Sequence, residues 1–80
     1  MERNEILIKL EGIFRDVFDN SKIVLSETVT SSDIDNWDSL HALCLFNEIE
    51  DLFGISLSLD ETMKMKSVAT IIDTISNHVN

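Results

Sequence analysis

Hydrophobic residues recur at intervals of three and four over three stretches of the chain, the spacing that places them on one face of an α-helix. The first stretch runs from about Arg3 to Phe18, the second from Ser39 to Phe53, and the third follows Ser67. Before the third, the segment from Leu59 to Met65 has room for only one or two helical turns. We therefore expect three longer helices and one short one.

Residues that suit helix ends stand at the boundaries of these stretches. Asp38 can accept backbone N–H bonds as an N-cap, which makes Ser39 the first residue of the second helix. Gly54 can adopt the left-handed conformation that ends this helix, and Ser67 can cap the last helix. The caps therefore agree with the apolar spacing on where these helices lie.

The stretch from about Asn20 to Asp38 keeps no period and is predicted to be a long loop. Ile23-Val24-Leu25 is strand-like in composition, but no second strand-like run is present to pair with it. A loop of this length is uncommon unless it is functional or tied down, and five of its apolar residues can pack across the helices: Ile23, Leu25, Val29, Ile34 and Trp37. The predicted fold is all-α, a small four-helix bundle with a long loop between helices one and two.

The second helix carries apolar residues on two of its faces. One face is assigned to the core and holds Ala42, Leu45, Phe46, Ile49, Leu52 and Phe53. The other face points away and holds Leu40, Leu43, Cys44, Asn47 and Asp51. Exposed apolar residues beside acidic ones are typical of a surface that binds a partner. The alternative is that Leu43 and Cys44 border the core and that Leu40 is an incidental exposed leucine.

Length and composition indicate one small domain, residues 1–80, in which 44% of the residues are apolar. We expect Met63 and Met65 to fill gaps in its core. The single cysteine, Cys44, excludes an internal disulfide and is consistent with a reducing compartment. No leader-like segment opens the chain and no apolar run is long enough to span a membrane, so we expect a cytoplasmic protein without membrane insertion. We also expect this protein to be a monomer.

The formal net charge of −9 is distributed unevenly along the chain. From Ile23 to Met63 there is no lysine or arginine, but there are nine acidic residues: Glu27, Asp33, Asp35, Asp38, Glu48, Glu50, Asp51, Asp60 and Glu61. Such a field repels nucleic acids and anionic membranes and attracts partners that have a basic surface. The alternative is an acidic surface that is merely solvated.

The sequence contains no set of residues that predicts catalysis. Ser39 lies outside a Gly-x-Ser-x-Gly motif, and His41 points about 200° away from it around the helix. A serine at the start of a helix can instead carry a covalently attached phosphate, because free N–H groups and the helix dipole favour an anion there. Ser67 also precedes a helix, but its role as a cap accounts for it.

Asp38-Ser39-Leu40, which opens a helix after a long acidic loop, resembles the attachment motif of acyl carrier proteins and of the related peptidyl carrier domains. The resemblance continues through Ile49-Glu50-Asp51-Leu52-Phe53-Gly54-Ile55, the short third helix and Ser67-Val68-Ala69-Thr70-Ile71. It therefore covers nearly the whole chain.

This resemblance implies a carrier protein that is not an enzyme. Ser39 would bear 4'-phosphopantetheine, which a phosphopantetheinyl transferase adds from coenzyme A with magnesium, and Asp38 would lie beside the transferase's metal. The thiol of the arm would hold acyl intermediates as thioesters for enzymes of fatty acid or related biosynthesis. These acyl-processing enzymes would bring basic patches to one face of helix two, called here the docking face: Leu40, Leu43, Asn47, Glu50 and Asp51.

Three residues near the motif depart from the fatty-acid-synthesis pattern. Trp37 replaces a small residue, while His41 and Cys44 stand where acids are common. Weaker docking on basic patches would follow, and a specialised aminoacyl or polyketide carrier is one alternative. A small acidic helical adaptor without a prosthetic group is the alternative from another class.

Overall fold

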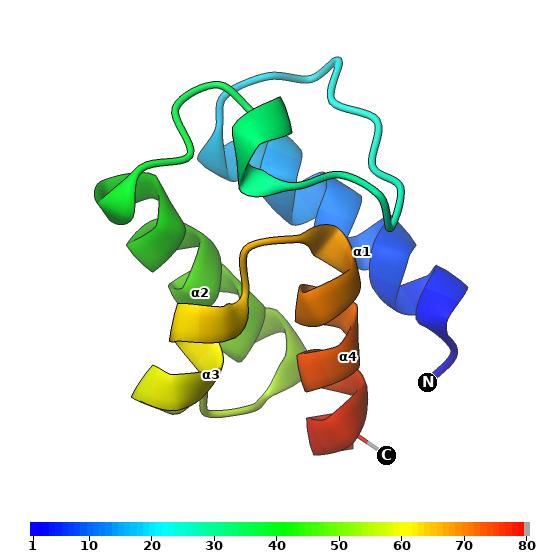
Figure 1. The fold of residues 1–80 in the computed structure, drawn as a ribbon. Coiled ribbons are helices and arrows are strands. Elements are labelled where there is room, and N and C mark those ends of the chain that lie inside the picture. Colours follow the sequence, from blue (N-terminus) through cyan, green and yellow to red (C-terminus); the bar gives the residue numbers. More distant parts are fainter. Residues whose placement is uncertain (80) are drawn as a thin grey trace.

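The computed structural model describes residues 1–79, which form four α-helices (Figure 1). These are α1 (Arg3–Val17), α2 (Ser39–Phe53), α3 (Leu59–Lys64) and α4 (Val68–Val79). One short 3-10 helix, η1 (Ser31–Asp33), interrupts the long loop between α1 and α2, and the described residues contain no strand. The predicted all-α fold, with a long loop between its first two helices, is confirmed.

The core lies where α1 packs against both α2 and α4. Its fully enclosed side chains come from the apolar stripes of these three helices and include Phe14, Leu45, Ile49 and Ile72, all 0% exposed. Burial of one such side chain stabilises the fold by roughly 1.5–3 kcal/mol. The apolar spacing thus predicts correctly which side of each long helix faces inward.

The caps of α2 and α4 are those that the sequence predicts. At the start of α2, the Asp38 carboxylate accepts the N–H of His41 at 2.9 Å. At its end, Gly54 is left-handed, with φ of 65° and ψ of 39°. At the start of α4, the Ser67 hydroxyl accepts the N–H of Thr70 at 3.2 Å. These contacts satisfy N–H groups that have no partner inside the helix.

The six-residue helix α3 is held by its own cap and by one contact to α4. Ser58 and Glu61 form a capping box in which each side chain accepts the other's backbone N–H, at 2.9 and 3.2 Å. The Glu61 carboxylate also lies 2.8 Å from Nε2 of His78. The bond from the Ser58 N–H and then that from His78 hold the pKa of Glu61 below its usual range.

The long loop is tied to α1 through its apolar residues. Ile23 and Leu25 are buried, as predicted. Nε of Arg15 donates to the Ile23 carbonyl oxygen at 2.8 Å, and the Leu25 N–H donates to the Glu11 carboxylate at 2.9 Å. These bonds satisfy backbone groups that a strand would otherwise pair, which is why this strand-like run stays a loop.

Two backbone hydrogen bonds, called here the strap, join the loop to the link between α3 and α4. The Ser31 N–H donates to the Lys66 carbonyl oxygen, and the Val68 N–H donates to the Val29 carbonyl oxygen, both at 2.9 Å. The strap brings the loop alongside the start of α4 (Figure 1). Nothing in the local sequence predicts it, because its partners are far apart along the chain.

Arg3 joins the start of α1 to two other parts of the molecule. Its guanidinium binds Glu27 of the loop, and Nη1 lies 2.6 Å from a carboxylate oxygen of Asp73 in α4. The hydrogen bond from Arg3 holds the pKa of Glu27 below its usual range. All three side chains are exposed, so this cluster contributes little to stability despite its span.

Two residues assigned to the core are exposed instead. Leu52 is 51% exposed because α2 extends past the core at its C-terminal end, where none of residues 50–58 is fully buried. Met63 is 63% exposed on the outer side of α3, whereas Met65 is buried as predicted. In both cases, burial of the side chain depends on which other elements pack beside it and not on the apolar spacing of its own helix.

Candidate functional site

Ser39 is the first residue of α2, at the edge of the molecule where the long loop ends (Figure 1). Its side chain is exposed, and its hydroxyl makes no hydrogen bond within residues 1–79. The N–H groups of Ser39 and Leu40 are likewise free of hydrogen bonds to the described chain. The first turn of α2 therefore presents a hydroxyl and unpaired N–H groups together, which favours an anion at this position.

Asp38 and His41 form a pair beside this serine. One oxygen of Asp38, Oδ1, accepts from the backbone N–H of His41 at 2.9 Å and lies 2.8 Å from its ring nitrogen Nδ1. The backbone bond first, and then the ring bond, hold the pKa of the Asp38 carboxyl below its usual range. The His41 ring also stacks on Phe18, with the ring centroids 5.6 Å apart and the planes 12° apart.

The role of His41 is one that the sequence reasoning missed. The prediction that it does not assist Ser39 rested on its angle around the helix, which says nothing of its contacts with Asp38 or Phe18. The available signal was its distance of three residues from the N-cap, which puts its backbone N–H and its ring within reach of the same carboxylate.

Trp37, which precedes the Asp-Ser pair, packs against the end of α1. Its ring lies edge-on to Phe14, with centroids 5.4 Å apart, and 5.9 Å from Phe18. The side chain is half-buried, so the prediction that Trp37 pins the loop across the helices is confirmed. A large residue at this position thus fixes the segment that delivers Asp38 and Ser39 to the start of α2.

A cleft of about 330 Å³ opens beside Ser39, between the start of α2 and the link from α3 to α4. Its apolar lining includes Trp37, Phe46 and Met65. Lys66 lies at the same cleft and forms no ion pair with the described residues. The cleft beside Ser39 therefore combines an unpaired cation with an apolar wall.

The outward face of α2 is exposed, as predicted. Leu40 is 68% and Leu43 is 57% exposed, which excludes the alternative that Leu43 borders the core. Asn47, Asp51 and Cys44 are exposed beside them. Large apolar side chains that remain in water next to acidic ones give this face the character of a binding surface.

Glu50 differs from the rest of the docking face. It is half-buried, and its carboxylate accepts the N–H of Leu57 at 2.8 Å, so it holds the turn after α2 in place. It also lines a shallow hollow of about 620 Å³ between α2 and α3, together with Leu43 and Asn47. Glu50 is therefore partly engaged in the fold, unlike Asp51.

Residues 1–79 hold no group of three or more His, Cys, Asp or Glu side chains that could bind a metal ion. None of the helices within those residues is both long enough and apolar enough to cross a membrane. The Ser39 hydroxyl lies next to the Asp38–His41 pair, in which the His41 ring contacts Asp38 through Nδ1 and stacks on Phe18.

Comparisons with known proteins agree on one family. The chain is 35% identical over 81 aligned residues to an acyl carrier protein of Thermosynechococcus vestitus, covering 99% of this chain and 98% of the relative. It also matches the solution structure of a holo acyl carrier protein from Geobacter metallireducens with a TM-score of 0.85 and 37% identity, over 91% of this chain and 84% of that one. No protein-family model matches the chain.

Proposed function

The chain belongs to the acyl carrier protein family, and from this premise we propose that Ser39 is the residue that bears its 4'-phosphopantetheine arm. The observation that carries the proposal is the exposed, unbonded hydroxyl of Ser39 at the first position of α2, directly after Asp38. The thiol at the end of the bound arm holds acyl intermediates as thioesters. The chain itself performs no catalytic step in this role.

The residues around Ser39 fit the arm. The free N–H groups at the start of α2 and the unpaired Lys66 favour the negative charge of the phosphodiester. The apolar wall of the cleft offers contact to the less polar part of the chain. We propose that Asp38, whose carboxyl has a lowered pKa, lies beside the metal of the phosphopantetheinyl transferase that adds the arm.

We assign partner recognition to the docking face. Leu40 and Leu43 offer apolar anchors, and Asp51 offers charge to a basic patch on the transferase or on acyl-processing enzymes. Asn47 lies on the same face, while Glu50 contributes through the hollow it lines between α2 and α3. A cytoplasmic, monomeric, single-domain carrier in fatty acid or related biosynthesis is the role that fits these features.

Intact mass spectrometry tests the attachment site. After incubation with coenzyme A, magnesium and a broad-specificity phosphopantetheinyl transferase, the wild type should gain the mass of one phosphopantetheinyl group, and Ser39→Ala should gain none. Ser67→Ala is the matched control, because Ser67 also precedes a helix but its hydroxyl is engaged with Thr70. Modification of Ser39→Ala, or loss of modification in Ser67→Ala alone, would contradict the assignment.

A further inference from the structure

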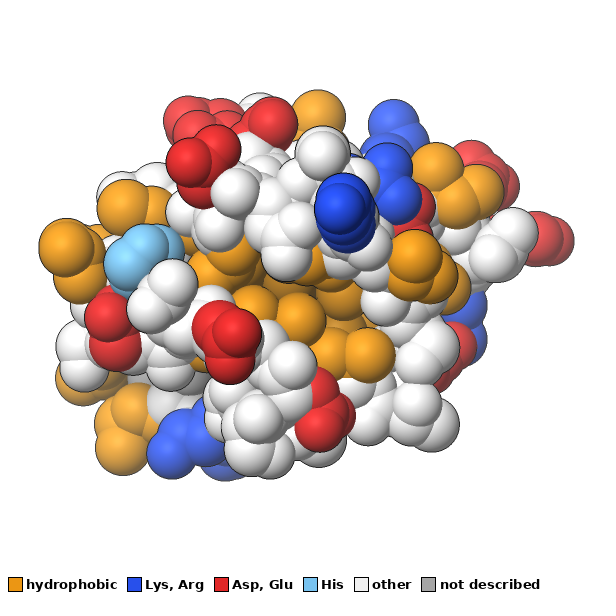
Figure 2. Space-filling model, turned by 90° about the horizontal axis from the view of Figure 1, so that it is seen from above, with side chains coloured by type: hydrophobic (Ala, Val, Ile, Leu, Met, Phe, Trp, Pro, Cys, Tyr) orange, Lys and Arg blue, Asp and Glu red, His pale blue; other side chains and the backbone are white. Residues whose placement is uncertain are grey.

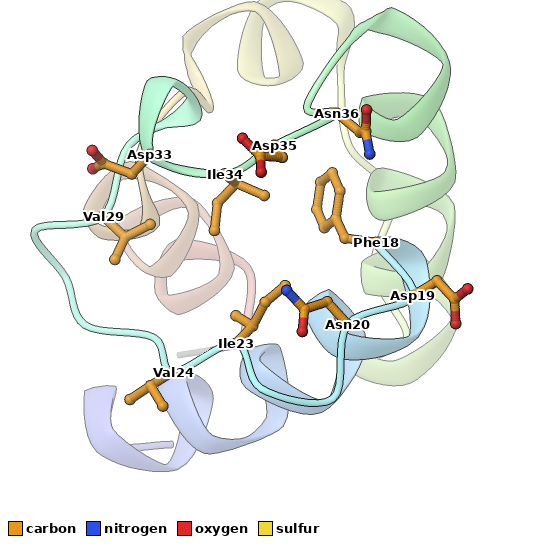
Figure 3. Close-up of a pocket in the computed structure, with 10 residues that line it drawn as sticks. All are labelled: Phe18, Asp19, Asn20, Ile23, Val24, Val29, Asp33, Ile34, Asp35 and Asn36. Atoms are coloured by element: carbon orange, nitrogen blue, oxygen red, sulfur yellow. The ribbon is translucent and has the colours of Figure 1, made fainter.

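The long loop and the end of α1 enclose a hollow that lies apart from the cleft at Ser39 (Figure 3). This loop hollow is lined by residues between 18 and 36 and has a volume of about 470 Å³. The volume falls within the roughly 300–1,000 Å³ that is usual for ligand-binding pockets. Neither Ser39 nor any residue of the docking face lines it.

The floor of the loop hollow is apolar. Phe18 and Ile23 are each 8% exposed, and Ile34 and Val29 are half-buried against the core. In Figure 3, Ile23 and Ile34 point toward each other from opposite sides, with the Phe18 ring beside them. Figure 2, which looks down on this side of the molecule, shows hydrophobic side chains at the bottom of a hollow, with several acidic side chains and one basic side chain around it. An apolar segment of a ligand can therefore lie on this floor.

The rim of the loop hollow offers acceptors for hydrogen bonds. Asp35 and Asn36 lie on the loop above the floor, and their side chains make no hydrogen bond or ion pair within residues 1–79. Asp33, by contrast, is already engaged by the N–H of Thr30 at 2.9 Å. No lysine or arginine is among the lining residues. The rim is therefore complementary to a cationic group that also donates hydrogen bonds.

We propose that the loop hollow receives an arginine side chain of a partner protein. An arginine combines an apolar stem, which can cover Ile23 and Ile34, with a charged head that stays near water. The planar guanidinium can donate two N–H groups to the Asp35 carboxylate at once. A lysine ammonium is more strongly hydrated and matches only the charge.

The position of the loop hollow makes it a second anchor for a partner that approaches the start of α2. Its floor residue Phe18 stacks on His41, which in turn contacts Asp38, so these two rings connect the hollow to the Asp38-Ser39 pair. A partner that reaches Ser39 can place an arginine in the hollow at the same time. The hollow itself does not involve the Ser39 hydroxyl, so the inference holds for unmodified protein too.

The test is a titration of isotope-labelled, unmodified full-length protein with Nα-acetyl-arginine amide, followed by NMR. We expect saturable shifts at Phe18, Ile23, Ile34 and the loop amides near Asp35, with identical behaviour in Ser39→Ala. Asp35→Asn should weaken binding roughly two- to fivefold, the range of one exposed ion pair. Asp35 is exposed, and a spectrum without the probe verifies that the variant keeps its fold.

Controls separate specific binding from a general charge effect. Asp60→Asn makes the same change at an exposed acid of α3 that has no side-chain bond in the described chain, and it should leave the affinity unchanged. Nα-acetyl-lysine amide and methylguanidinium, which lack the planar head and the stem respectively, should bind more weakly. Equal weakening by the two Asn variants, equal binding of the lysine probe, or shifts confined to the docking face would each overturn the proposal.

Discussion

At the scale of single residues, Asp38 is held by two contacts to one oxygen. The backbone N–H and the ring Nδ1 of His41 both reach Oδ1, at 2.9 and 2.8 Å. Because His41 also stacks on Phe18, the carboxylate is fixed in relation to α1 as well as to its own helix. This arrangement holds the residue next to Ser39 in one orientation.

The lowered pKa of Asp38 predicts a loss of stability in acid. A carboxyl whose pKa is lower in the folded chain stabilises the fold above its unfolded pKa, about 3.9, and loses this contribution as pH falls through the folded value. Asp38→Asn removes this titration but keeps a side-chain oxygen that can cap the helix. We therefore expect the melting temperature of the wild type to fall more steeply than that of Asp38→Asn below about pH 4.

Thermal unfolding followed by far-ultraviolet circular dichroism across this pH range measures the difference. Glu27 and Glu61 also have lowered pKa values, but they titrate in both proteins and so cancel in the comparison. Asp60→Asn should follow the wild type. Parallel curves for the wild type and Asp38→Asn would show that the Asp38–His41 contacts do not stabilise the fold.

The sequence identifies Asp38 as the N-cap of α2 and Ser39 as its first residue, because capping is a local preference. It does not identify the contact between His41 and Phe18, since His41 lies in α2 and Phe18 follows α1, far apart along the chain. The loop hollow could not be predicted from the sequence for the same reason. Phe18 comes from the end of α1 and Ile34 from the loop, and only the fold brings them together.

At the scale of elements, α2 is buried on one face and exposed on the other. Leu45 and Ile49 are fully buried on one side, while Leu40 and Leu43 are mostly exposed on the other. Substitution on the outer side can therefore alter recognition with little effect on the core. This separation makes the docking face testable without unfolding the protein.

Leu43→Ala should weaken recognition by the phosphopantetheinyl transferase. An apolar anchor at a protein interface often contributes more than 1 kcal/mol, so we expect a fall in kcat/KM of about fivefold or more. Ile8→Ala is the matched control, since Ile8 is 64% exposed on α1 and Leu43 is 57% exposed on α2. Steady-state kinetics with each variant as substrate provide the measurement.

An equal effect of both substitutions would place the recognition surface elsewhere than on α2. Unchanged melting temperatures for both variants would establish that the kinetic difference arises from recognition. The result is independent of the loop hollow, to which neither Leu43 nor Ile8 contributes.

Helix existence and boundaries could be predicted because both depend on nearby residues. The stripes of α1 and α4, the cap at Ser67 and the left-handed Gly54 all follow from spacing and side-chain type. The exposure of Leu52 could not be predicted, because it depends on how far the other helices extend beside the end of α2. The 3-10 turn η1 was not predicted, although a local capping box stabilises it, in which the Asp33 carboxylate accepts the Thr30 N–H at 2.9 Å.

At the scale of the whole molecule, the acidic middle of the chain remains largely uncompensated. Between residues 23 and 63 only Glu27 is paired with an arginine, while Asp38 and Glu61 contact histidines. No lysine forms an ion pair within residues 1–79. The compact state therefore gathers like charges that the unfolded chain keeps farther apart.

Magnesium or calcium at millimolar concentration should raise the melting temperature, because cations screen this repulsion. The rise should be roughly 4–8 °C for each kcal/mol gained, which is the scale for a domain of this size. Differential scanning calorimetry gives the measurement, and sodium chloride at matched ionic strength is the control. Because screening depends on ionic strength, sodium should also raise the melting temperature.

A melting temperature that does not respond to either salt would show that the repulsion is unimportant. A response to divalent ions alone, saturating at one ion per chain, would instead indicate a specific cation site. The expected result is a gradual rise with both salts.

The strap has a consequence for how the protein opens. The Val68 N–H, which begins α4, is bonded to the loop at Val29, so the loop cannot lift away unless that amide loses its partner. Native-state hydrogen exchange should then show Ser31 and Val68 exchanging in one opening event, as a single cooperative unit. An arginine in the loop hollow would slow both amides together, so a ligand held under the loop could be detected at the first turn of α4, which is far from the loop along the chain.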